Sequence, residues 1–337
     1  MKVKRNLPHN IIEDDINLFK HELEVNIDNP KIDYLKNVYI RNNKFYRFNR
    51  FEFKSKLWKM NAYSSKVKTK VFLKNFSFLN LFKKSDCDII ENGVWVTDEK
   101  SNMYFHWMLD TQQRLELFKN NITNNNSIQL LIPESLYKSP FVKMTVKIYD
   151  IEIKLIKEDT TYKISNLIIP NHLAKSGNYN PTIINLIRSR YLDYLSSLMH
   201  DIKPSRKVWI TRQNSRIRKI KNFDEIEDIL IKNNFEIHDF DNTDYLEQLK
   251  IVSEAEVIGS LHGGGLSNML LMKSGKKIIE IKAQNDDKNN CYFSLASALN
   301  LSYYYFLASV EDMDFKFYLS DYHVDKNLFN KFLKTII

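Results

Sequence analysis

The sequence predicts an α/β protein whose second half forms a parallel sheet with helices on both faces. The first observation is a regular alternation of short strands and helices that runs from residue 207 to about residue 306. The second is a set of short apolar runs in the first half, two of which end at Pro133 and Pro170. Such alternation is typical of parallel sheets, because a crossover helix must return the chain to the same end of the sheet.

The first half of the chain begins with strands. Period-two alternation over Asn37–Arg47 predicts short strands and hairpins, and Asn92–Thr97 predicts another strand. Apolar spacing predicts an amphipathic helix over residues 102–119 and a long helix from Pro181 to before Pro204. Buried strands are predicted at residues 128–132, 151–156 and 167–169.

The second half restarts after Pro204 with a strand. Further strands are predicted at residues 207–210, 235–238, 256–258, 277–281 and 303–306, and helices at 223–233, 245–253, 266–272, 292–299 and 324–337. We therefore expect an N-terminal domain over residues 1–203, with a strand-rich extension at 1–90, and a C-terminal domain over 204–312. Residues 313–337 are expected to pack back on the first domain as a helix.

Composition restricts the class of protein. Of the 337 residues, 43% are apolar and 27% are charged, which excludes a mainly disordered chain. The two cysteines, Cys87 and Cys291, exclude a disulfide scaffold and a four-thiolate zinc site. Neither a secretory signal nor an apolar run of about 20 residues is visible, so we expect a cytoplasmic protein. The net charge of +9 favours anionic partners, including peripheral contact with an anionic membrane face.

Most of the glycines lie in one loop. Only seven occur, and four of them (Gly259, Gly263, Gly264 and Gly265) lie within seven residues, between a predicted strand and a predicted helix. Glycine tolerates positive φ and lets a ligand approach the backbone, and a helix N-terminus offers free N–H groups. The loop thus predicts an anion site, most naturally for a diphosphate, with donors from His262, Ser267 and Asn268. The alternative is a tight turn with packing glycines.

Two charged residues at strand ends converge on this loop. Arg212 follows the strand 207–210, and ligands of open parallel sheets lie beyond the carboxyl ends of the strands. Arg212, with Arg218 nearby, can pair with a phosphate. The alternative is that these arginines only form a solvated basic loop, and this alternative is strongest for Arg216. Glu280 ends another strand and can accept hydrogen bonds from ribose hydroxyls, unless it is an ordinary edge charge.

The first half contains one candidate for acid–base chemistry. His106, Asp110 and Arg114 are spaced at i, i+4 and i+8 and share a face if the segment is helical. A histidine and a carboxylate one turn apart can act as an acid–base pair. A purely structural His–Asp–Arg ladder is the alternative.

The segment around His106 and the second half around the glycine loop together resemble glycosyltransferase family 61. Its first motif has the form N-x-x-H-W-x-x-[DE]-x-x-x-R-L, which appears here as Tyr104, His106, Trp107, Asp110, Arg114 and Leu115. The second-half matches are Thr211-Arg212, Arg218, Asn222, Glu247-Gln248, Gly259–Asn268 and Ile278–Glu280. The sequence departs from the family at Gly264, where alanine is usual, and at Gln112-Gln113, where Leu-Pro is common. Residues 1–90 match no motif of the family.

The resemblance implies a GT-B-like architecture, in which two Rossmann-like domains face a cleft. It implies inverting transfer from a nucleotide sugar, with a UDP-sugar as the expected donor, to a glycan or lipid-linked acceptor, without a metal or other cofactor. By analogy it also implies bacterial capsule or lipopolysaccharide synthesis. The donor residues would be Arg212, Arg218, Ser260, His262, Gly263, Gly264, Gly265, Asn268 and Glu280. Trp107 and Arg114 would lie on the acceptor side, and the base would be Asp110 or His106, with Asp110 favoured.

Other readings of the sequence remain. Three Asp-x-Asp patterns, at residues 86–88, 239–241 and 312–314, are the form that a metal-dependent transferase would need, but chance matches are expected in a chain this rich in Asp. The charge also allows a nucleic-acid or phosphate-ligand binding protein without catalysis. Against nucleic acid, the basic residues are scattered and no binding motif appears. The basic runs 66–70 and 216–221 are expected to meet substrate phosphates or a membrane face.

Overall fold

The chain divides into two compact units. The computed structural model describes residues 1–41, 44–49, 52–54, 87–121, 128–199, 201–310 and 320–337. Unit 1 comprises Met1 and Ile27–Ile183, and unit 2 comprises Lys2–Asn26 and Ile184–Ile337. The division falls inside the helix α7 (Pro181–Leu198) and not at Pro204, where the break in the predicted elements placed it.

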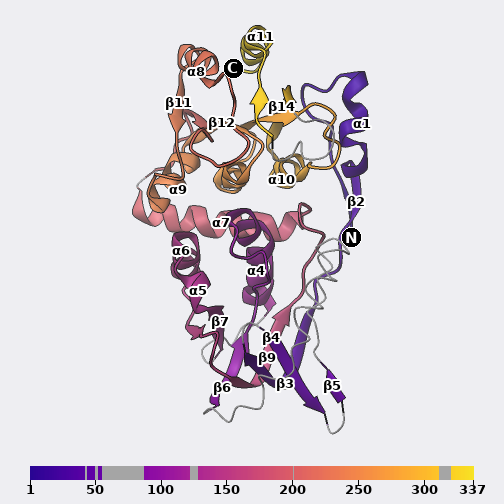
Figure 1. The fold of residues 1–337 in the computed structure, drawn as a ribbon, viewed down its shortest axis with the longest axis vertical. Helices are drawn as coiled ribbons and strands as arrows, with labels where there is room; N and C mark the ends of the chain where they lie inside the picture. The colour runs from indigo at the N-terminus through magenta and orange to yellow at the C-terminus, as the bar shows by residue number, and fades with distance from the viewer. Residues whose placement is uncertain (42–43, 50–51, 55–86, 122–127, 200, 311–319) are drawn as a thin grey trace. The chain divides into compact units, whose positions relative to one another are not determined.

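Unit 1 is built on a seven-stranded mixed sheet (Figure 1). Its order is β5-β4-β3-β9-β6-β7-β8, and the last four strands run parallel. The bounds are β3 (Ile32–Arg41), β4 (Lys44–Asn49), β5 (Glu52–Lys54), β6 (Asp88–Val94), β7 (Gln129–Pro133), β8 (Ile153–Ile156) and β9 (Tyr162–Pro170). The predicted strands are therefore present, although β3 and β9 are longer than their apolar runs because the two pair with each other over most of their length.

The helices of unit 1 differ from the prediction in two places. The helix predicted at 102–119 is three consecutive segments, α3 (Tyr104–His106), a π-helical turn η4 (Trp107–Thr111) and α4 (Gln112–Asn121). Between β7 and β8 lie two helices that the sequence pattern did not predict, α5 (Glu134–Tyr137) and α6 (Pro140–Tyr149). Proline at the first position of α6 suits a helix start, since its missing N–H would have no partner there.

Unit 2 contains the predicted parallel sheet. Its order is β11-β10-β12-β13-β14-β15, with every pair parallel except the last. The strands are β10 (Arg206–Ile210), β11 (Phe235–His238), β12 (Ala255–Leu261), β13 (Lys277–Ala283), β14 (Ser302–Val310) and β15 (Tyr322–His323). The helices are α8 (Phe223–Lys232), α9 (Tyr245–Ser253), α10 (Cys291–Ala298) and α11 (Lys326–Ile336). After the glycine loop the chain forms a 3₁₀ helix, η5 (Gly264–Leu271), in place of the predicted α-helix.

The N-terminal segment belongs to unit 2, although the sequence placed it in the first domain. It contains β1 (Lys2–Lys4), η1 (Glu13–Asp15), α1 (Ile16–Phe19), η2 (Lys20–Glu22) and β2 (Glu24–Asn26). It lies along β14: the His9 N–H donates to the Tyr303 carbonyl, and the Asn10 side chain bonds both backbone groups of Tyr305. The segment thereby satisfies backbone groups that β14 would otherwise expose at the sheet edge.

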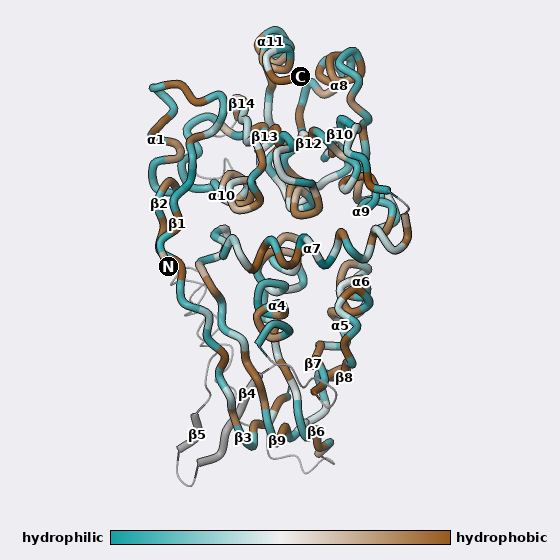
Figure 2. Tube along the Cα trace, turned by 180° about the vertical axis from the view of Figure 1, so that it is seen from behind, coloured by the Kyte–Doolittle hydropathy of each residue, from teal (hydrophilic) through white to brown (hydrophobic). Residues whose placement is uncertain are grey.

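The C-terminal helix also packs within unit 2, and not on the first domain as expected. In Figure 1 α11 lies beside α8, and Phe329, Leu333 and Ile336 join the core around Trp209. Figure 2 shows both hydrophobic and hydrophilic residues along α11, as an amphipathic helix requires. No helix in the described part of the chain combines the length and apolar character of a membrane span.

Candidate active site

The glycine loop of unit 2 lies where the strand order of the sheet reverses. In chain order the parallel strands run 2-1-3-4-5, so the order reverses between β10 and β12, and the crevice beyond their carboxyl ends is the usual ligand site of such sheets. Ile210 and Ser260, near the ends of β10 and β12, are in register with Glu280 in the middle of β13. The residues that follow these strands are therefore brought together, as the sequence predicted.

Gly263 lies against the guanidinium of Arg212, whose flexible side chain would have to move to admit a larger residue there. A Cβ at Gly263 would collide with the Arg212 guanidinium, and one at Gly265 would lie 2.9 Å from the Ile210 side chain. Gly263 has an extended backbone with φ of 172°. Space for neighbouring side chains, rather than the positive φ that the sequence suggested, explains the glycines at these two positions.

Arg212 and Arg218 lie close together, and Asp241 is a described carboxylate whose charge acts on Arg212 without forming an ion pair with it. The Arg212 Nε lies 3.4 Å from the carbonyl of Arg218, and neither guanidinium makes an ion pair with a described carboxylate. Burial, followed by the charge of Arg218, lowers the pKa of Arg212. The Arg218 Nε is buried without a hydrogen bond, and Arg218 adopts a φ of 59°, which is uncommon for a residue with a side chain. Two cations held together in this way favour an anion between or beside them.

Two predicted donor residues support the loop from within. The Ser260 hydroxyl donates to the carbonyl of Ile210 at 2.8 Å, and the Asn268 amide donates to the carbonyl of Gly265 at 2.9 Å. Both side chains are about 1% exposed. They therefore hold the glycine loop in shape, whereas the sequence had suggested direct contact with the ligand.

Glu280 faces His262 in the structure. It is fully buried, with one carboxylate oxygen bonded to His262 Nδ1 and the other accepting from the Tyr303 hydroxyl at 2.5 Å. Burial and the charge of Glu280 raise the pKa of Tyr303, which keeps its proton. Because Glu280 is fully buried and both its oxygens bond protein groups, the structure gives no support to the ribose role expected from its position.

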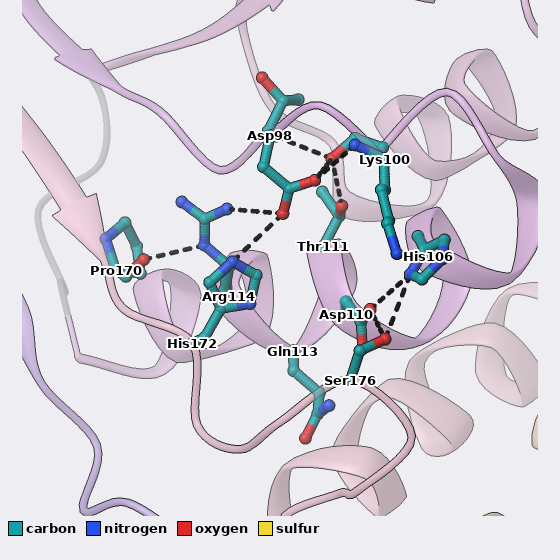
Figure 3. Close-up of polar contacts among 12 residues, drawn as sticks. Asp98, Lys100, His106, Asp110, Thr111, Gln113, Arg114, Pro170, His172 and Ser176 are labelled. Carbon is teal, nitrogen blue, oxygen red and sulfur yellow. Dashed lines mark hydrogen bonds and ion pairs between the residues drawn. The ribbon is translucent and has the colours of Figure 1, made fainter. Parts of the chain in front are cut away.

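In unit 1 the equivalent reversal of strand order lies between β6 and β9. Asp98 follows β6 and His172 follows β9, and His172 Nε2 lies 3.1 Å from an Asp98 oxygen (Figure 3). Burial alone would raise the pKa of Asp98, but the contact with His172 and the charge of Arg114 hold it well below its usual value. Ser101 connects this cluster to η4 through a 2.8 Å hydrogen bond to Thr111.

His106 and Asp110 contact each other beside this cluster. His106 Nδ1 lies 2.7 Å from Asp110 Oδ2, and the Ser176 hydroxyl donates to the same oxygen at 2.6 Å (Figure 3). The side chains of His106 and Asp110 are 11% and 5% exposed. The π-turn between them is a rare conformation that occurs mostly at functional sites. The acid–base pair predicted from the i, i+4 spacing is therefore in contact.

Trp107 and Arg114 lie in the interior of unit 1. Both are fully buried. Trp107 donates to Thr145, while Arg114 donates to the carbonyls of Pro170 and Trp95 at the ends of β9 and β6. They thus brace the strand ends and η4, and their burial removes them from the contact with an acceptor that the sequence suggested.

Sequence reasoning missed Asp98, His172, Ser176 and Tyr303. Asp98 and His172 follow strand ends, so the rule that identified Arg212 could have found them as well. Ser176 lies in a loop before Gly177, whose φ is 90°, and nothing in its surroundings marks it. Tyr303 reads as an ordinary strand residue.

Only one of the three Asp-x-Asp patterns lies wholly in the described residues. Asp239 accepts hydrogen bonds from Asn214, Asn242 and the Asp241 N–H, which shape the loop after β11. Asp86 and residues 312–314 lie outside the described residues, as does the basic run 66–70. Within the described part of the chain, no three His, Cys, Asp or Glu side chains form a group that could hold a metal ion.

Comparison with known proteins agrees with the family resemblance of the sequence motifs. The model of a family described as Glycosyltransferase 61 matches residues 104–279. An EGF domain-specific O-linked N-acetylglucosamine transferase of Drosophila melanogaster is 24% identical over 257 residues, which cover 68% of this chain and 49% of the relative. The chain therefore spans about half the length of the curated relative that it matches.

Proposed function

The chain belongs to glycosyltransferase family 61, and from that premise we propose that it transfers the sugar of a nucleoside diphosphate sugar to an acceptor hydroxyl with inversion, releasing the nucleoside diphosphate. The observation that carries the proposal is the Arg212–Arg218 pair beside Gly263, at the ligand position of a parallel sheet and without an ion pair to a described carboxylate. A diphosphate is the part of the donor that such a site would bind.

The donor side acts on the leaving group. Arg212 and Arg218 offset the charge that develops on the diphosphate as the glycosidic bond breaks. The N–H groups of Gly264 and Gly265 precede the first backbone hydrogen bond of η5, from Leu266 N to Gly263 O, and can donate to the same phosphates.

The acceptor side supplies a base. Inversion requires an acceptor hydroxyl that loses its proton while it attacks the anomeric carbon opposite the leaving group. Asp110 is the proposed base, with His106 orienting its carboxylate. The Ser176 hydroxyl already donates to Asp110 Oδ2, which supports the view that this oxygen can accept a bond from a hydroxyl.

Several finer features extend the proposal. Family likeness supports a GT-B arrangement with the two units facing a cleft, and a UDP-sugar as donor. The Drosophila relative is named for N-acetylglucosamine transfer, so UDP-N-acetylglucosamine is the first donor to test. By family analogy, the acceptor is a glycan or lipid-linked intermediate of bacterial capsule or lipopolysaccharide synthesis. The charge of +9 supports a cytoplasmic enzyme that makes peripheral contact with an anionic membrane.

Removal of the Arg212 guanidinium tests the donor site. Arg212→Ala should weaken UDP binding by ~1.5–3 kcal/mol, the usual value of a charged hydrogen bond, or about 10- to 150-fold in Kd. Arg216→Ala, which removes an exposed arginine from the same loop, is the matched control and should change Kd little. Titration calorimetry with UDP measures both. Equal affinities in the two variants would remove Arg212 from the site.

The proposed role of Arg212 and Arg218 predicts that turnover does not need a metal ion. If Arg212 and Arg218 replace the divalent ion that neutralises the diphosphate in other transferases, turnover should persist in excess EDTA. Turnover that stops on chelation and returns with Mg²⁺ or Mn²⁺ would contradict this mechanism and direct attention to the Asp-x-Asp patterns.

A further inference from the structure

The contacts of His262 restrict the way in which it can bind a phosphate. Its Nδ1 faces the carboxylate of Glu280, which is fully buried. A carboxylate only accepts hydrogen bonds, so the proton of this bond is on Nδ1. The Tyr303 hydroxyl donates to the other oxygen of the same carboxylate. His262 is thereby held in the tautomer with Nδ1–H, and no described residue makes a hydrogen bond with its Nε2.

We propose that donor binding takes up one proton, which His262 receives at Nε2. A neutral ring with Nδ1–H has only a lone pair on Nε2 and cannot donate to a phosphate oxygen. When the diphosphate arrives, a proton from solvent adds to Nε2, and the imidazolium donates an N–H bond to the phosphate while Nδ1–H stays on Glu280. Glu280 and Tyr303 are positioning residues for this proton. The inference rests on the proposed diphosphate site.

The positive charges beside His262 explain why the proton would arrive with the ligand. Arg212 contacts Gly263, the next residue in the chain, and Arg218 lies beside Arg212. A third cation at this position adds repulsion, which Glu280 beside His262 and Asp241 near Arg212 offset only in part in the free protein. A bound diphosphate brings negative charge to all three groups and makes the protonated ring favourable.

The other titratable groups around His262 do not supply the proton. The Tyr292 ring of α10 lies 5.0 Å from the imidazole, and burial raises the pKa of Tyr292 well above its usual value, as it does for Tyr303 on β14. Cys291 precedes Tyr292 on the same helix. Lys282, two residues beyond Glu280 on β13, directs its ammonium to Asn289 and Asn290. The proton therefore comes from solvent.

The decisive variant is Glu280→Gln. With the Tyr303 hydroxyl donating to the amide oxygen, the amide nitrogen faces His262 and donates to Nδ1. The ring then carries its proton on Nε2 while neutral, so it can donate to a phosphate without taking up a proton. Tyr305→Phe is the matched control, since it removes another hydroxyl–carboxylate bond of β14, to Asp15, that does not touch His262.

The experiment is titration calorimetry of the full chain with UDP, in buffers that differ in ionisation enthalpy, between pH 6 and 9. The wild type and Tyr305→Phe should take up close to one proton at their maximum, and Glu280→Gln close to none. Ligand-free ¹⁵N NMR should find the Nδ1–H tautomer of His262 in the wild type and the Nε2–H tautomer in Glu280→Gln.

The outcomes separate the inference from the proposed function. Binding of UDP without proton uptake in the wild type, or uptake unchanged in Glu280→Gln, overturns the inference and leaves the diphosphate site intact. An Nε2–H tautomer in the free wild type overturns it as well. Failure of UDP and GDP to bind the wild type, with the Nδ1–H tautomer present, overturns both the site and the proton uptake assigned to it.

Discussion

At the scale of single residues, the family motifs contain two kinds of side chain. Arg212, His106 and Asp110 are the side chains that we propose act on the substrates. Gln248 and Asn222, which belong to the same motifs, bond backbone groups instead: Gln248 donates to the carbonyls of Phe240 and Thr243, and Asn222 to that of Val324. A motif therefore identifies a family without separating the residues that react from those that shape the loops.

Asp110 and His106 can be separated by substitution. Asp110→Asn keeps the size of the side chain but cannot accept a proton, and a positioned base contributes ~10²–10⁴ in rate. We expect kcat to fall by that factor with UDP affinity and melting temperature nearly unchanged. A structural His–Asp–Arg ladder predicts the reverse, a lower melting temperature with activity per folded molecule preserved.

His106→Ala completes the comparison. If Asp110 is the base and His106 orients it, His106→Ala should retain more activity than Asp110→Asn. Loss of turnover in His106→Ala, with Asp110→Asn near the wild type, would assign the base to the histidine.

At the scale of elements, strand ends explain what the sequence could predict and what it could not. The strands of unit 2 and the placement of Arg212 and His262 at one edge follow from the alternation of strands and helices, because parallel strands bring their carboxyl ends together. The π-turn η4 was not predictable, since Trp107–Thr111 has the apolar spacing of an ordinary helix and its conformation depends on contacts from distant residues. The burial of Glu280 likewise depends on Tyr303 from another strand.

Asp98 connects the ends of β6 and β9, and its charge should matter for stability. Its lowered pKa means that the carboxylate stabilises the folded state above the unfolded pKa of ~3.9 and loses this contribution as the pH falls toward the folded value. Asp98→Asn removes the carboxylate that faces the fully buried Arg114, and loss of one member of a buried ion pair costs ~3–5 kcal/mol in comparable proteins.

Urea unfolding of the wild type and Asp98→Asn measures this effect. At pH 5 to 7 we expect the full difference in unfolding free energy between the wild type and Asp98→Asn. Below pH ~4 we expect this difference to be smaller. A difference that does not change with pH in that lower range would show that packing, and not the charge of Asp98, determines it.

At the scale of the whole molecule, unit 2 is built from two segments far apart in the sequence. Arg5 bonds Glu22 within the N-terminal segment, and Asn290 donates to the carbonyl of Leu18, which ties this segment to the start of α10. The Phe19 ring is fully buried, 5.1 Å from the ring of Phe293 and 6.2 Å from that of Tyr303. The strand that carries Tyr303 is therefore packed on one side by residues from the other end of the chain.

Phe19→Ala tests whether the N-terminal segment supports the donor site. Replacement of a fully buried phenylalanine typically costs ~3–5 kcal/mol, and the cavity would lie against Tyr303, which bonds Glu280. We expect a lower melting temperature and weaker UDP binding under conditions where the variant remains folded. Leu7→Ala is the control, because Leu7 lies in the same segment and is 42% exposed. Unchanged UDP affinity in folded Phe19→Ala would mean that the segment covers the sheet edge without acting on the site, since the bond between Tyr303 and Glu280 would then not depend on the packing around Phe19.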